Sequence, residues 1–346
     1  MNQYLDYIME QLEKLMAIDS PSGFTKKVTD YLLEEYARLG YSAKRTVKGG
    51  VIAEIGGDPI LTMAHVDTLG AVVAEIKSNG RLRLSPVGGF NANNAEAHNC
   101  RVYTYDGQIY EGTIQLADAS LHVNKEYSTT QRTFQSVEVV LDEPVTSKDD
   151  VKALGITNGF FVCADPNLVV TNSGYIKSRF LDDKLSAAIL LGYAKYIREN
   201  NITPLRKVYQ HMTVFEEVGH GACASIPEDV TELLSVDMGC VGDGLECTER
   251  QVSICAKDGH GPYNYQVTTG LVNAAKKDSI DYAVDIYPFY GSDADAALSA
   301  GKDARHGLIG AGVYASHGYE RSHKDGVVNT FRLLCSYLNG NAPKMD

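Results

Sequence analysis

The sequence predicts an α/β fold in which a layered domain with a mixed sheet is interrupted by a small all-β domain. Over residues 1–71 and 168–346, segments with apolar side chains at helical spacing alternate with short, continuously apolar segments. Helices that alternate with buried strands are typical of layered α/β domains. Residues 72–167 instead show short stretches of alternating polarity separated by turns, and no long helix. We therefore expect a discontinuous α/β domain over 1–71 and 168–346, with a barrel-like β domain inserted over 72–167.

The amino-terminal part is expected to form two helices and two strands of the layered domain. Helical spacing of apolar residues predicts a first helix that ends before "DSPSG" at 19–23, where proline and glycine break it. A second helix is expected over 24–40, with Gly40 in a position suited to its C-cap. The apolar segments 51–57 and 60–73 predict strands, the second of them buried on both faces.

The rest of the chain repeats these patterns. The "YDGQ" at 105–108, between two alternating segments, predicts a β-hairpin in the inserted domain. A strand and a loop over 167–180 lead into a long, apolar helix that ends near residue 200. Further strands are expected over 206–215, 232–239, 251–258 and 306–316, with helices near 263–278 and over 328–340.

Composition and charge exclude several classes of protein. The 346 residues are 44% hydrophobic and 22% charged, which is typical of a globular protein larger than one ordinary domain. The net charge of −12 argues against nucleic acid as a partner and favours cations. No apolar segment is long enough to span a membrane, and the amino terminus predicts an acidic amphipathic helix rather than a signal peptide. The seven cysteines form no C-x-x-C pair, so we expect reduced thiols and a cytoplasmic protein.

Histidine and carboxylate side chains follow the predicted strands of the layered domain. In open α/β sheets, ligands bind beyond the carboxyl ends of the strands. Imidazole and carboxylate ligands without cysteine suit zinc, cobalt or manganese, and an excess of carboxylates suits two ions that share a bridging ligand. The candidate ligands come from five separate segments: His65 and Asp67, Asp182 and Asp183, Glu216 and Glu217, Asp237, and His323.

Taken singly, several of these residues also have structural explanations. A strand places residues i and i+2 on one face, so Asp67 is expected to orient the imidazole of His65. Asp182 and Asp183 precede an apolar helix, where such a pair commonly caps the first turn. Asp293, in "GSDADAA", equally fits a helix-capping position. The metal interpretation therefore depends on the whole set.

Six motifs in register resemble those of one enzyme family across nearly the whole chain. The chain resembles the tetrahedral-assembly (TET) dinuclear zinc aminopeptidases, which include glutamyl and deblocking aminopeptidases. The "SPSG" at 20–23, the "VGGF" at 87–90 and the position of the β insertion are also similar to that family. The resemblance implies a three-layer, mixed-sheet metallopeptidase domain of the phosphorylase/hydrolase-like class. The six motifs are "AHVDTLG", "LDDKLSA", "FEEVGHGA", "SVDMG", "GSDADAA" and "ERSHKDG".

The resemblance also implies a ligand set for two divalent ions, most simply two zinc ions, with cobalt or manganese as alternatives. In this set His65 and Asp237 bind one ion and Glu217 and His323 bind the other. Asp182 bridges the two ions.

Further roles come from the same resemblance. Glu216 is implied as the general base, Asp67 as the residue that orients His65, and Asp293 as part of the substrate pocket. The reaction implied is release of a free amino-terminal residue from a peptide. The inserted β domain is implied to mediate dimerisation and assembly into a larger homo-oligomer, such as a dodecamer.

Two positions depart from the family pattern. Thr68 stands where the family usually has glutamate after His-x-Asp, so it is a candidate for contact with the first metal or with the substrate amine. The common Arg-Tyr-x-His-Ser ending is absent, because the chain runs "SHGYERSHKDG". His317 is therefore the alternative to His323 as a metal ligand.

Other functions remain open from the sequence. An amidase, deacylase or dipeptidase could use the same two ions on a modified amino acid or small amide. A glycosidase needs two carboxyl groups about 5–10 Å apart on opposite sides of a bond. Adjacent residues in an extended chain point in opposite directions, which disfavours Glu216 and Glu217 as that pair. A non-catalytic assembly protein would not require the full ligand set.

Overall fold

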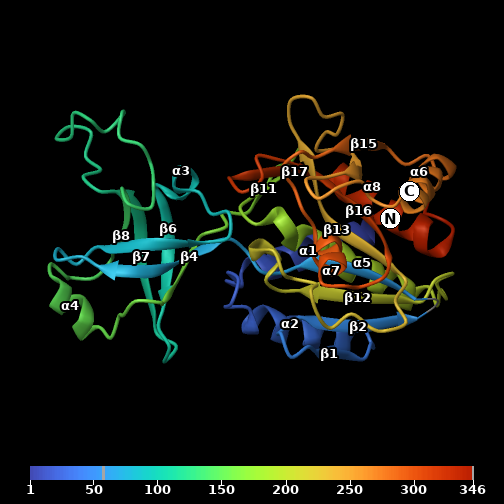
Figure 1. The fold of residues 1–346 in the computed structure, drawn as a ribbon, viewed down its shortest axis with the longest axis horizontal. Coiled ribbons are helices and arrows are strands. Elements are labelled where there is room, and N and C mark those ends of the chain that lie inside the picture. The colour runs from blue at the N-terminus through green and yellow to red at the C-terminus, as the bar shows by residue number, and fades with distance from the viewer. Residues whose placement is uncertain (57–58, 345–346) are drawn as a thin grey trace. The chain divides into compact units, whose positions relative to one another are not determined.

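The computed structural model describes residues 1–56 and 59–344 and separates the chain into two compact units (Figure 1). One unit comprises Met1–Asp67 and Asn167–Asp346, and the other comprises Thr68–Pro166. The first boundary therefore lies after residue 67 rather than 71, and the second after 166 rather than 167. Gly57, the last residue of the strand expected over 51–57, lies outside the described residues.

The discontinuous unit is built on a mixed sheet of 11 strands among the described residues. These are β1 (Ala43–Arg45), β2 (Val51–Gly56), β3 (Ile60–His65), β10 (Val169–Val170), β11 (Tyr175–Ser178), β12 (Val208–Thr213), β13 (Glu232–Val241), β14 (Val252–Lys257), β15 (Tyr282–Ile286), β16 (Arg305–Tyr314) and β17 (Glu320–His323). The centre is parallel, because β3 pairs with β12 and β13, and β13 pairs with β16. Antiparallel strands flank it, with β2 on β12 and with β14 and β17 on β16.

Helices cover both faces of this sheet. They are α1 (Asn2–Met16), α2 (Lys26–Arg38), α5 (Leu181–Glu199), α6 (Tyr265–Lys277), α7 (Asp293–Ser299) and α8 (Lys324–Asn339), with the 3₁₀ turn η1 (Glu216–Val218). Gln210 of β12 donates its Nε2 to the carbonyl of Leu190 in α5. The preceding residue, Tyr209, packs instead against a cluster that contains Ala294 and Ala297 of α7. Successive side chains of a strand point to opposite faces, so α5 and α7 lie on opposite sides and the domain has three layers.

The central helix α5 is buried along most of its length, which agrees with its continuously apolar sequence. It packs against α1 as well as against the sheet. The helices α5 and α1 approach each other closely at Gly192, where an added Cβ would lie 2.4 Å from Cγ1 of Ile8. A residue without a side chain is therefore needed at this crossing.

The second unit is a closed antiparallel barrel, which confirms the predicted barrel-like domain. Its strands are β4 (Gly70–Ile76), β5 (Leu82–Val87), β6 (His98–Tyr103), β7 (Ile109–Leu116), β8 (Val137–Leu141) and β9 (Phe161–Ala164), in the order β4-β5-β8-β7-β6-β9. Two short helices, α3 (Ala92–Ala95) and α4 (Lys148–Ala153), belong to the same unit. The predicted hairpin at 105–108 joins β6 to β7.

One strand expectation is corrected by the structure. The apolar segment 60–73 is not a single strand, because β3 ends at His65 and β4 begins at Gly70. Both strands are largely buried and therefore apolar, so the apolar pattern continues across the break and gives no sign of it. The short segment between them contains the boundary of the two units.

Among the described residues, no helix combines the length and the apolar character that a membrane crossing requires. All seven cysteines are free thiols. Five of them are buried and two, Cys223 and Cys240, are partly exposed.

Candidate metal centre and substrate cavity

Acidic side chains and histidines meet at the carboxyl end of the parallel strands, as expected for an α/β sheet. His65 is the last residue of β3, and Asp237 lies on β13 just beyond the residues that pair with β3. Glu216 and Glu217 form the turn η1 directly after β12. Asp182 lies at the start of α5. Four segments that are distant in the sequence therefore contribute to one cluster.

His65 is buried at the centre of these contacts and only 1% exposed. Its Nε2 lies 2.9 Å from Oδ1 of Asp182 and 3.7 Å from Oε2 of Glu216. Its Nδ1 lies 2.9 Å from the carbonyl oxygen of Asp67. The backbone N–H of His65 donates to Oδ2 of Asp183 at 3.1 Å. Burial lowers the pKa of the imidazole, but Asp182 and the neighbouring carboxylates outweigh burial and raise that pKa well above its ordinary value.

The carboxylate of Asp67 holds the turn that carries the two glutamates. It accepts hydrogen bonds from the backbone N–H groups of Glu216 and Glu217, at 3.2 and 3.4 Å, and from the hydroxyl of Ser22 at 2.6 Å. Its Oδ1 lies 3.7 Å from Nδ1 of His65. The contact that orients His65 is thus made by the Asp67 carbonyl, and the Asp67 side chain connects the "SPSG" segment to η1.

Glu216 and Glu217 do not lie in an extended chain, because η1 is a 3₁₀ turn. The turn is bounded by left-handed residues, Phe215 with φ 72° and Gly219 with φ 83°. The two side chains nevertheless diverge, since Oε2 of Glu216 is 3.7 Å from Nε2 of His65 and Oε2 of Glu217 is 3.6 Å from Nε2 of His317. Burial raises the pKa of both carboxyl groups well above its usual range.

The structure does not bring His323 to this cluster. Its Nε2 contacts the carbonyl oxygen of Ser173 at 2.8 Å, and its Nδ1 accepts the backbone N–H of Asp325 at 3.0 Å, where His323 caps α8. Both ring nitrogens are therefore engaged elsewhere. His317 lies there instead, with Nε2 at 3.6 Å from both Oδ2 of Asp182 and Oε2 of Glu217. The histidine in the cluster is therefore His317, the alternative, and not His323, which was expected there.

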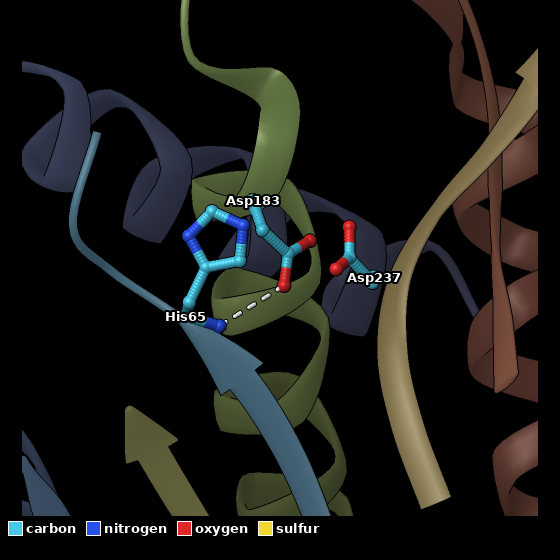
Figure 2. Close-up of side chains that lie close together, drawn as sticks. All are labelled: His65, Asp183 and Asp237. Atoms are coloured by element: carbon cyan, nitrogen blue, oxygen red, sulfur yellow. Dashed lines mark hydrogen bonds between the residues drawn. The ribbon is translucent and has the colours of Figure 1, made fainter. Parts of the chain in front are cut away.

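Glu320 is a member of the site that sequence reasoning missed, and Asp183 is a candidate ligand from the sequence that the implied ligand set left without a role. Figure 2 shows the carboxylate of Asp183 next to His65 and Asp237. Glu320, 2% exposed, accepts the backbone N–H groups of His317 and Asp182 at 3.0 and 3.1 Å. Burial and the charge of Asp182 raise the pKa of Glu320 to about 8. Asp183 had the pattern of a helix cap, and Glu320 stood in a polar segment that gave no sign of its burial.

The two expected substrate contacts differ from each other in their surroundings. Asp293 lines the cavity described below, and Thr68 is not among the residues that line it. Asp293 accepts the hydroxyl of Thr213 and, at 2.7 Å, the backbone N–H of Ala222, so it fixes the loop after the glutamates. A Cβ at Gly221 would lie 2.1 Å from Oδ1 of Asp293. Burial raises the pKa of Asp293 to about 6. Thr68 is the first residue of the barrel unit, and its hydroxyl donates to the carbonyl of Leu69 at 3.1 Å.

The cluster opens into a cavity of about 650 Å³. Its inner wall contains five members of the cluster, and the remaining wall comes from β13, from the loops after β12, β14, β15 and β16, and from α7. A cavity of this volume can enclose an amino-acid side chain together with the adjoining peptide bond. The five members are Asp182, Glu216, Glu217, Asp237 and His317.

The donor set fits divalent cations. Three groups of described side chains bring their potential ligand atoms within 4.8 Å of one another. Two belong to this cluster, namely His65 with Asp182 and Glu217, and His65 with Asp183 and Asp237, and the third is Asp258 with His260 and Asp295. Burial, and then the charge of Asp182, raise the pKa of Asp237 to about 7. Within the described part of the chain, Oε1 of Glu217 and Oδ1 of Asp183 are buried without a hydrogen-bond partner. Buried carboxylates at this density are stabilised either by protons or by cations, which offset their mutual repulsion.

The sequence model of the M42 glutamyl aminopeptidase family matches residues 49–333. The chain belongs to the M42 aminopeptidase family. The putative aminopeptidase YhfE of Bacillus subtilis (strain 168) is 43% identical over 334 residues, which are 95% of this chain and 96% of that protein. Membership in the M42 family makes the protein a peptide hydrolase, and the family implies divalent metal ions.

Two solved structures share the fold and confirm the resemblance to the TET aminopeptidases. A TET aminopeptidase from the marine sediment archaeon Thaumarchaeota archaeon SCGC AB-539-E09 has a TM-score of 0.86 and 19% identity over 96% of both chains. The TET1 peptidase of Pyrococcus horikoshii has a TM-score of 0.82 and 22% identity over 94% of this chain and 98% of that chain. That peptidase can assemble into a tetrahedron or a large octahedral shell.

Proposed function

We propose that this M42 aminopeptidase releases the amino-terminal residue of peptides with two divalent ions and a glutamate general base. One observation carries the two-ion proposal. The two oxygens of Asp182 face different histidines, with Oδ1 at 2.9 Å from Nε2 of His65 and Oδ2 at 3.6 Å from Nε2 of His317. A carboxylate placed between two imidazoles in this way can bridge two ions.

The residues present divide into two ligand sets around that bridge. His65 and Asp237 are proposed to bind one ion, and Glu217 and His317 the other. His317 replaces His323 because only His317 contacts the other members of the set. Zinc suits these nitrogen and oxygen ligands, and cobalt or manganese are alternatives. When bound, such ions polarise a carbonyl oxygen and lower the pKa of a coordinated water.

Glu216 is proposed as the general base. Its carboxylate lies beside His65 and lines the cavity, and it is not needed in either ligand set. Asp67 holds the backbone N–H of Glu216 and so fixes the position from which the carboxylate acts. Glu216 takes the proton from the attacking water and passes it to the leaving amine.

Metal content and substrate choice test this proposal together. We expect about two divalent ions per chain in the loaded protein, loss of activity with a chelator, and recovery with zinc. Aminoacyl anilides should be hydrolysed and the matched N-acetyl aminoacyl anilides should not, because an aminopeptidase requires a free amine. Full activity of metal-free protein, or preference for the acylated compounds, would contradict the proposal. The second result would favour a deacylase or amidase on the same ligands.

The barrel unit is proposed to mediate assembly into a homo-oligomer built from dimers. Support comes from the P. horikoshii peptidase, which shares the fold and forms closed shells. Light scattering during size-exclusion chromatography measures the assembly directly, and a monomer at micromolar concentration would contradict this part. The cytoplasmic location stays a prediction, which fractionation of the native host can test.

A further inference from the structure

The cavity wall beyond the proposed metal ligands carries an unbalanced negative charge. Among the described residues that line the cavity there is no lysine and no arginine. Besides the proposed base Glu216, two carboxylates line it that belong to neither proposed ligand set, Asp293 and Asp295. Much of the remaining wall is apolar, from residues such as Met238, Phe289 and Ala296.

Both carboxylates are held in place by their own contacts. Asp295 accepts the backbone N–H and the hydroxyl of Ser292, at 3.0 and 2.9 Å, and the hydroxyl of Tyr263 at 3.1 Å. Its Oδ1 lies 3.6 Å from Nε2 of His306. Asp293 is tied to the backbone N–H of Ala222. Neither side chain can swing away from an entering group without losing these hydrogen bonds.

A substrate carboxylate in this cavity would lose water without gaining a cationic partner. Two ions in the proposed sites would offset the carboxylates that bind them, but Asp293 and Asp295 lie outside those sets. The imidazole of His260 also lines the cavity. Desolvation of an unpaired charge is unfavourable, and the repulsion from two fixed carboxylates adds to it.

We infer that the substrate cavity rejects acidic side chains and selects peptides whose amino-terminal residue is neutral or basic. This inference rests on the proposed aminopeptidase function and names its substrate class. It differs from the glutamyl preference in the family description, because charge selection depends on the cavity wall rather than on the metal ligands.

Glutaminyl and glutamyl anilides test the inference because they match in shape and differ in charge. At pH 8 with zinc, we expect kcat/KM for the glutamyl anilide to be at least about 100-fold below that for the glutaminyl anilide, since an unpaired carboxylate is costly to bury. Leucyl and lysyl anilides should both exceed the glutamyl compound by at least about tenfold. Equal rates for the glutaminyl and glutamyl anilides would overturn the inference.

A variant that carries a cation in the cavity wall tests whether electrostatic repulsion causes the selection against acidic side chains. Ser299 lines the cavity, is exposed and ends α7, so a long side chain fits there and a cation suits the helix end. Ser299→Arg should raise the ratio of glutamyl to glutaminyl turnover by about tenfold, which corresponds to one new ion pair. Ser299→Met controls for length, and Gln266→Arg, on the exposed surface of α6, controls for net charge. A ratio that does not change in Ser299→Arg would overturn the electrostatic cause.

Binding of free amino acids separates this inference from the proposed function. Calorimetry on the zinc-loaded protein should give a Kd for L-glutamine at least about tenfold below that for L-glutamate. If no anilide is hydrolysed but this difference is present, the proposed function fails and the inference stands. If glutamate binds as tightly as glutamine, or if neither binds, the inference is overturned whatever the enzyme hydrolyses.

Discussion

The two histidines that follow β16 differ in what their ring nitrogens contact, and this difference predicts opposite consequences for metal binding. His317→Ala should remove about one ion per chain and lower kcat/KM by at least about 100-fold, because a metal ligand is lost. His323→Asn should leave metal content unchanged, since asparagine still caps α8 and costs at most about 1 kcal/mol of stability. Metal analysis with steady-state kinetics checks both, and metal loss in the His323 variant alone would restore the ligand first expected.

The two adjacent glutamates should separate in the same measurements. Glu216→Gln should keep about two ions per chain and lower kcat by about 10²- to 10⁴-fold, because only the general base is lost. Glu217→Gln should lower metal content, because its carboxylate is a proposed ligand and an amide is a weaker one. Equal metal loss in the two variants would show that the base and the ligand have been assigned in error.

The residues that were hardest to predict are those whose roles depend on burial and on turns. His317 and His323 stand six positions apart in one polar segment, so neither spacing nor composition could choose between them. Glu320 in that segment reads as a surface charge, although the structure buries it against two backbone N–H groups. His65 and Asp237 were easier, because each follows or interrupts an apolar strand.

At the scale of elements, the loop after η1 should depend on the absence of a side chain at Gly221. An added Cβ would lie 2.1 Å from Oδ1 of Asp293, so Gly221→Ala must displace the carboxylate or the loop. We expect a loss of about 1–3 kcal/mol in the free energy of unfolding, as for other overpacked sites, together with a lower kcat/KM. Urea unfolding measures the first quantity. Gly242→Ala is the matched control, because nothing lies within 4 Å of its added Cβ, and a similar loss there would contradict this explanation.

Most elements could be predicted because their periodicity is strong, and the exceptions have physical causes. The helices over Tyr265–Lys277 and Lys324–Asn339 carry apolar stripes, and both agree with the expected segments within a few residues. The break between β3 and β4 was missed because both strands are buried and a continuous apolar pattern carries no information on strand ends. The turn η1 was missed because a strand pattern runs directly into two glutamates with no proline or glycine before them.

For the whole molecule, removal of metal should make stability fall as pH rises. In the metal-free fold, burial raises the pKa of Asp237 to about 7, and that of Asp183 and the two glutamates well above its usual range. The folded state then binds more protons than the unfolded state between about pH 4 and pH 7. Metal-free protein should therefore be less stable at pH 8 than at pH 6, and chelation should lower Tm more at pH 8. Thermal unfolding with and without chelator at both pH values checks this, and a metal-free Tm that rises with pH would contradict it.

The closed barrel has a consequence for the chain that carries it. Its first and last strands are neighbours, with Ala71 paired to Val162, so the chain enters and leaves the barrel on adjacent strands that are about 5 Å apart at this pair. The insertion has nearly a hundred residues. Once the barrel has folded, however, the loop-closure entropy that the host domain loses corresponds to a connection of only a few residues. The segments bearing His65 and Asp182 are distant in the printed sequence but near neighbours along the path that the folding chain has to close.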